Sequence, residues 1–205
     1  MANQHSPLAE RVEQLRDELQ HRDCAQLAVQ TGTTFHPTGE DNGFFTFPYW
    51  GEETILPCAD YIARDRSSEQ PLGLLDQAMI AYYFHESKGS PDPGGWIAFS
   101  ELPDGQFYSS AFKGYTAKKI LQKFGSDYRA FENKSLELNG KRVGFASGAF
   151  VYQILPQTAV MAAYWRGDED FSPSYQILFS DTVSCHLPTD ACAILGSMLT
   201  GQYLS

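Results

Sequence analysis

Three consecutive carboxylates, Asp168, Glu169 and Asp170, are the first candidates for chemistry in this chain. They interrupt an apolar, strand-like pattern over residues 164–179, which predicts a hairpin with a charged tip. Hard cations such as Ca²⁺ or Mg²⁺ prefer carboxylate oxygens, although so short a loop supplies few of them. Two interpretations follow: a solvated tip anchored by Trp165 and Phe171, which we favour, or a metal site.

Histidine and cysteine residues are the next candidates for acid–base catalysis or metal binding. His85, at the end of a helix predicted over residues 71–86, could act as an acid or base, or could simply interact favourably with the helix dipole. Cys185 and His186, with Cys192 seven residues after Cys185, come closest to a soft-metal cluster, but the paired-cysteine spacing of zinc sites is missing. We therefore assign no metal site and expect the four cysteines to be free thiols.

Motifs for common catalytic and nucleotide sites are missing from the sequence. There is no Gly-x-Ser-x-Gly elbow, no Gly-x-Gly-x-x-Gly and no Walker-type Gly-Lys-Ser. A basic group, Lys113, Lys118 and Lys119, lies near a predicted helix start, where backbone amides favour anions. These lysines have a second interpretation as a solvated helix face.

Length, composition and charge limit the class of protein. The 205 residues are 42% hydrophobic and 14% aromatic, which is enough for a packed core. The formal net charge of −10 disfavours nucleic acid and anionic lipid as partners. No apolar run approaches the roughly 18 residues that span a bilayer, and the first residues are polar, so we expect no membrane partner and a cytoplasmic location.

Periodicity predicts an order of helices and strands. Helices are expected from Pro7 to about residue 24 and over residues 71–86, 107–124, 128–138 and from 189 to the end. Strands are expected over residues 25–32, 43–50, 55–65, 95–103, 149–155, 158–165 and 174–180, the last three forming an antiparallel meander. The elements come in blocks, which favours an α+β fold with a mainly antiparallel sheet and helices packed on one side. We expect an amphipathic helix in residues 1–24 and a single domain in residues 25–205.

Three segments, residues 71–84, 95–116 and 164–190, are similar to a bacterial and archaeal family described as domain of unknown function 3786. The similar motifs are Trp165, the acidic turn at residues 167–170, the pair at residues 173–174 and the strand end at residues 178–179. The resemblance spans roughly residues 25–200. Some relatives carry this domain beside a four-cysteine iron-sulfur module of the type found in corrinoid and electron-transfer proteins of anaerobes. The resemblance therefore implies a setting in redox or one-carbon metabolism and an iron-sulfur or corrinoid protein as partner. This chain has no clustered four-cysteine segment of its own.

Three functions are consistent with the sequence. The first is a non-catalytic accessory protein that holds a small molecule or cofactor of unknown identity in an aromatic-lined cleft, because aromatic residues are abundant and catalytic signatures are missing. The cofactor-binding candidates are the following: Trp50, Trp96, Lys113, Trp165, Arg166 and Asp168. The second is an enzyme that uses His85 or a metal ion at the acidic turn. The third is an acidic module that binds a basic protein partner.

Overall fold

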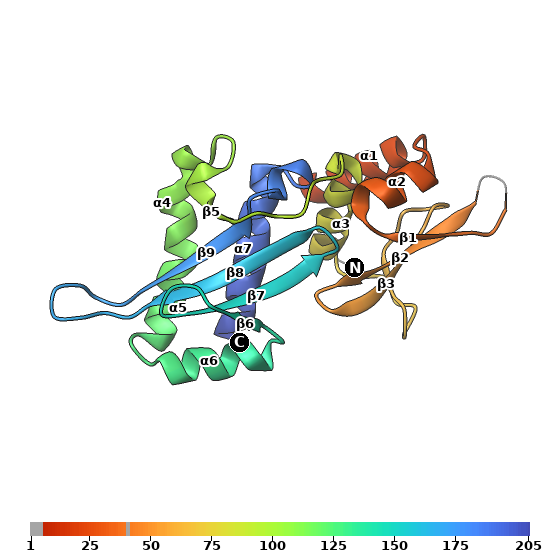
Figure 1. The fold of residues 1–205 in the computed structure, drawn as a ribbon. Helices are drawn as coiled ribbons and strands as arrows, with labels where there is room; N and C mark the ends of the chain where they lie inside the picture. The colour runs from red at the N-terminus through yellow and green to blue at the C-terminus, as the bar shows by residue number, and fades with distance from the viewer. Residues whose placement is uncertain (1–5, 40–41) are drawn as a thin grey trace. The chain divides into compact units, whose positions relative to one another are not determined.

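A computed structural model describes residues 6–39 and 42–205, which form two compact units (Figure 1). The first unit contains the described residues up to Pro91 together with residues 154–157 and 185–188, and the second contains the others. Each unit combines helices with an antiparallel sheet, so the predicted α+β class is confirmed. The single domain expected over residues 25–205 stays a prediction. No helix within the described residues is both long and apolar enough to cross a membrane.

The first unit packs three helices with a four-stranded sheet. Its elements are α1 (Pro7–Leu19), α2 (Cys24–Thr31), β1 (Thr34–Pro37), β2 (Gly43–Tyr49), β3 (Glu52–Pro57), β4 (Arg64–Asp65) and α3 (Leu74–Glu86), and the strands follow the order β1-β2-β3-β4. All three strand pairs are antiparallel. Phe84 of α3 packs against Phe45 and Phe47 of β2, with ring centroids 4.9 and 5.4 Å apart. Alternate residues of β2 thereby form the core of this unit.

A buried hydrogen-bond network links α1 to α3. The Gln77 side-chain oxygen accepts hydrogen bonds from the Arg16 guanidinium at 2.8 Å and from the Ala63 backbone N–H at 2.9 Å. The Gln77 amide in turn donates to the Ala63 carbonyl at 2.7 Å. Arg16 and Gln77 are both buried, so these bonds satisfy groups that would otherwise be costly to desolvate.

The strand predicted for residues 25–32 is wrong, because this segment forms α2. The Asp23 side chain caps the helix by accepting the Gln26 backbone N–H at 2.7 Å, and Gly32 ends it in the left-handed conformation at φ 63°. Val29, the β-branched residue that favoured a strand, is 79% exposed. Capping at both ends therefore outweighs its strand preference.

The second unit contains a five-stranded sheet. Its elements are β5 (Trp96–Ala98), η1 (Phe99–Glu101), α4 (Gly105–Tyr115), α5 (Ala117–Phe124), α6 (Tyr128–Glu137), β6 (Lys141–Val143), β7 (Gly148–Leu155), β8 (Thr158–Trp165), β9 (Ser174–Ser180) and α7 (Thr189–Leu204), and a short 3₁₀ turn, η2 (Val183–Cys185), precedes α7. The strand order is β5-β9-β8-β7-β6, which confirms the predicted meander of β7, β8 and β9. In Figure 1, β8 and β9 extend past the end of the sheet, and their connecting loop projects from it.

Aromatic side chains pack the helices of this unit on one face of its sheet. Phe131 of α6 meets Phe150 of β7 and Tyr175 of β9, with centroids 5.7 and 5.1 Å apart. The ring centroids of Phe112 in α4 and Phe179 in β9 are 6.0 Å apart. The other face of the sheet carries an apolar cluster of its own, made of Ala149, Met161, Ala163 and Leu178 with Trp96, Ala98, Val143, Val151 and Trp165 around it.

Several predicted elements have different bounds in the structure. The strand expected over residues 95–103 ends at Ala98, after which η1 begins, and the helices expected from Pro7 to about residue 24 and over residues 71–86 are shortened to α1 and α3. The helix expected over residues 107–124 breaks at Thr116, whose φ of −115° and ψ of −94° are not helical, into α4 and α5. The Thr116 hydroxyl donates to the Phe112 carbonyl at 2.6 Å, which holds the break. The strand expected over residues 55–65 ends at Pro57 and is followed by a turn and the short β4.

Candidate functional site

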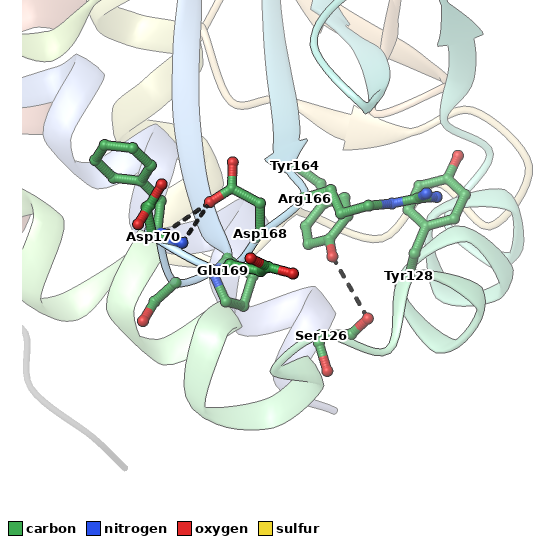
Figure 2. A pocket seen from close by; sticks show the side chains of 11 residues that line it. Ser126, Tyr128, Tyr164, Arg166, Asp168, Glu169 and Asp170 are labelled. Carbon is green, nitrogen blue, oxygen red and sulfur yellow. Dashed lines mark hydrogen bonds between the residues drawn. The ribbon is translucent and has the colours of Figure 1, made fainter.

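A cavity of about 630 Å³ lies beside the loop that joins β8 to β9 (Figure 2). One side is formed by the hairpin residues 164 and 166–173, and the other by Ser126 and Tyr128 at the start of α6. The buried Tyr164 lies between them and donates to the Ser126 carbonyl at 3.4 Å. The whole cavity belongs to the second unit.

Asp168 builds the tip of the hairpin. Its carboxylate accepts the backbone N–H groups of Asp170 and Phe171 at 2.9 and 2.8 Å. Its own N–H donates to the Phe171 carbonyl at 2.9 Å. A Cβ at Gly167 would lie 2.7 Å from that carbonyl oxygen, so the turn requires glycine there. The role that the structure shows for Asp168 is thus to hold the loop in shape.

The remaining charged side chains of the cavity are exposed. Within the described residues, Arg166, Glu169 and Asp170 form no ion pair. In Figure 2, the Arg166 side chain points to the side where Tyr128 lies, and the acidic residues of the tip occupy the other side. With Asp168, the lining has one positive and three negative charges, a formal balance of −2. The cavity therefore favours positive charge overall, with a single positive side chain at one end.

Tyr128 is held as a hydrogen-bond donor in the wall. Its hydroxyl donates to Glu132 at 3.1 Å, and Glu132 also pairs with Arg142 at 2.8 Å. Burial raises the pKa of Tyr128, and the Glu132 carboxylate raises it further. The phenol therefore stays protonated at neutral pH. Behind its ring, Gly148 leaves no room for a side chain, because a Cβ there would lie 2.3 Å from the ring.

Two of the predicted site residues line the hairpin cavity. These are Arg166 and Asp168, but no tryptophan lines any of the three cavities described. Trp165 packs edge-on against Phe145, with centroids 6.0 Å apart, and Trp96 belongs to the same apolar cluster of the sheet.

Two further predicted residues lie elsewhere. Trp50 occupies the β2–β3 turn at φ 52° and contacts Tyr49, with ring centroids 6.4 Å apart. Lys113 lines a hollow of only about 20 Å³. The ligand-binding roles of these tryptophans and of Lys113 stay predictions.

Sequence reasoning missed Tyr128 and Tyr164. Side chains alternate between the two faces of a strand, so Tyr164 faces the cavity while its neighbour Trp165 faces away. β8 is buried on both faces, with Met161 and Ala163 as inaccessible as Val160 and Ala162, so its apolar sequence did not show which face Tyr164 takes. No pattern in the sequence pointed to Tyr128, since it reaches the cavity only through the packing of α6.

His85 is engaged by two carboxylates. Its ring nitrogens lie 2.7 Å from Glu18 and 2.9 Å from Glu86. The hydrogen bond from His85 is the first cause of a lowered pKa at Glu18. Both imidazole nitrogens are thus occupied in this geometry, and the structure gives no direct support for the predicted acid or base role.

His186 is buried between two serines of the first unit. Its ring nitrogens lie 3.0 Å from the Ser87 hydroxyl and 2.8 Å from the Ser90 hydroxyl, and burial lowers its pKa to about 4. Cys192 is buried, and burial raises its pKa to about 12. Among the described residues, no group of three or more His, Cys, Asp or Glu side chains is placed to hold a metal ion.

Comparison with models of protein families places the chain in a family. A family model described as a domain of unknown function, DUF3786, matches residues 23–202. The chain belongs to this family. The DUF3786 match begins at the cap of α2 and ends within α7, so it spans both compact units and includes the hairpin cavity. Neither the curated proteins nor the solved structures gave a match to this chain.

Proposed function

We propose that this DUF3786 protein is a binding protein whose hairpin cavity holds a small organic cation. The observation that carries the proposal is the combination, in one cavity, of carboxylates with an exposed aromatic ring. Phe171 is 73% exposed and lines the cavity together with Glu169 and Asp170. A ring face and carboxylates side by side are the features that attract an ammonium group with an apolar body.

The charge pattern favours a ligand with a defined orientation. An ammonium group beside the tip is attracted by three carboxylates, whereas a carboxylate at the other end of the ligand meets the Arg166 guanidinium. Because these side chains are exposed, each attraction is close to its value in water, about 1 kcal/mol at 4 Å. Several such contacts together with ring burial correspond to affinities in about the micromolar to millimolar range.

The cavity volume limits the size of the ligand. About 630 Å³ lies within the range of roughly 300–1,000 Å³ that holds drug-sized molecules. The proposal is thus for a molecule of a few hundred daltons. An iron-sulfur or corrinoid protein as partner, implied by the family resemblance, remains a separate prediction.

The test compares a cation with its neutral analogue. We expect 2-phenylethylamine to bind the full chain in isothermal titration calorimetry and 2-phenylethanol, which has the same ring without the charge, to bind at least tenfold more weakly. A panel of diamines, amino acids, corrinoids, haems and flavins in a thermal-shift assay then identifies the preferred class. Native mass spectrometry of the purified protein shows whether a ligand is retained.

A matched pair of variants locates the binding. Phe171→Ala removes the exposed ring from the cavity, and Phe107→Ala removes a somewhat more exposed ring, 84% accessible, from α4 outside it. Phe171→Ala should weaken amine binding while Phe107→Ala leaves it unchanged. Equal affinities for amine and alcohol, or equal losses in the two variants, would contradict the proposal.

A further inference from the structure

Two cysteines lie in contact in the first unit. The Cys24 thiol donates to the Cys58 sulfur, and the two Sγ atoms are 2.9 Å apart. Cys24 is the first residue of α2, and Cys58 directly follows β3, where its backbone N–H donates to the Gly43 carbonyl at 2.9 Å. The start of α2 and the backbone hydrogen bond of Cys58 therefore position the two residues, and the close approach of the sulfurs is part of the fold.

The thiols face an accessible space. Both line a cavity of about 410 Å³ whose wall also includes Arg22, Phe35 and Tyr61. The Tyr61 hydroxyl lies 3.7 Å from the Cys24 sulfur, and both cysteines are half-buried. No third metal ligand accompanies them in the part of the chain that the structure describes. The arrangement thus offers a pair of sulfurs and room for a reagent.

We propose that Cys24 and Cys58 are a redox-active dithiol that becomes an intramolecular disulfide by exchange with a low-molecular-weight disulfide of the glutathione type. A disulfide bond is about 2.05 Å long, so the sulfurs need to approach by about 0.9 Å from their separation of 2.9 Å. Side-chain rotation can supply such a movement. This site is separate from the hairpin cavity, and the inference does not depend on the proposed function.

The exchange takes place in two balanced steps. The thiolate of Cys24, beside the N-terminal amides of α2, attacks one sulfur of the small disulfide, forms a mixed disulfide and releases one small thiolate. Cys58 then attacks the Cys24 sulfur and releases the second small thiol. The two protons of the cysteines pass to the two departing thiolates, so the protein loses two hydrogens and the small disulfide gains them.

The two cysteines differ in role. Burial raises the pKa of Cys58 to about 12, and its contact with Cys24 acts in the same direction. Cys58 is therefore almost entirely a protonated thiol at neutral pH and is suited to the second, intramolecular step, where proximity compensates for weak ionisation. Cys24 is assigned the first attack because it begins a helix.

The test is a thiol count on the full-length protein. The reduced chain is incubated anaerobically with glutathione disulfide, alkylated under denaturing conditions and analysed by mass spectrometry. We expect two of the four cysteines to become protected from alkylation and a peptide pair joined through Cys24 and Cys58. Four alkylated cysteines after prolonged incubation, or a disulfide through Cys185 or Cys192, would overturn the inference.

Variants separate the two steps. Cys58→Ser should stop at one glutathione bound to Cys24, and Cys24→Ser should give neither adduct nor disulfide. The control Cys185→Ser, which alters another half-buried thiol, should react like the unmodified protein. A tightly bound metal that a chelator removes, and whose presence protects both thiols, would also overturn the inference, because a metal would then explain the close pair.

Discussion

Lowering the pH from 7 to 4 should destabilise the first unit through His186. This side chain is fully buried, and burial lowers its pKa from 6.5 to about 4. Below pH 6.5 the unfolded chain binds a proton that the folded chain excludes, so the unfolding free energy falls as the pH falls. Lowering the pKa to about 4 corresponds to about 3 kcal/mol of unfolding free energy, which is fully present above pH 6.5 and lost as the pH falls to about 4.

Urea unfolding monitored at a series of pH values measures this loss, with His186→Gln as the reference. Glutamine can still bond to Ser87 and Ser90 but does not titrate, so its unfolding free energy should change by about 3 kcal/mol less between pH 7 and pH 4. Carboxylates with lowered pKa values, such as Asp65 with a pKa of about 2, lose their contribution only below about pH 4. Equal pH profiles for the two proteins, or an NMR-titrated pKa of His186 near 6.5, would refute the reasoning.

Three further outcomes are expected. The double substitution Glu169→Gln with Asp170→Asn removes two exposed charges from the cavity and should weaken 2-phenylethylamine binding by about 30-fold, at about 1 kcal/mol for each carboxylate; an unchanged calorimetric affinity would argue against the charge assignment. Gly148→Ala should displace the Tyr128 ring, because the new Cβ would lie 2.3 Å from it. This variant should bind 2-phenylethylamine more weakly while its circular dichroism spectrum stays native. An unaltered affinity for the amine would exclude Tyr128 from the site. Gln77→Leu should lower the unfolding free energy by about 3 kcal/mol in urea titration, since a buried guanidinium and a buried backbone N–H lose their acceptor; a loss below 1 kcal/mol would show that water replaces the amide.

Local patterns in the sequence predicted much of the fold. Breaks at residues 156–157 and 167–170 separate three runs of strand-forming residues, and these runs predicted the meander of β7, β8 and β9. The start of α1 is also as expected, with the Ser6 hydroxyl accepting the Ala9 N–H at 3.2 Å. The strand prediction for α2 was wrong because it weighed β-branched residues above the caps at Asp23 and Gly32.

The site was less predictable because it depends on parity and on long-range packing. An error of one residue along β8 exchanges Tyr164 for Trp165 and moves the expected ring to the opposite face of the sheet. The contact between Cys24 and Cys58 joins residues 34 apart in sequence through a helix start and a strand end, and no spacing rule relates such positions. Capping and alternation act locally, whereas cavity walls depend on how elements pack.

A two-dimensional NMR titration of the full chain with 2-phenylethylamine tests the central claim most directly. The account predicts that backbone amide shifts concentrate in residues 126–128 and 164–173 and saturate with increasing amine, while 2-phenylethanol at the same concentrations produces much smaller changes. Saturating shifts confined to other parts of the chain, or no shifts at millimolar amine, would contradict it.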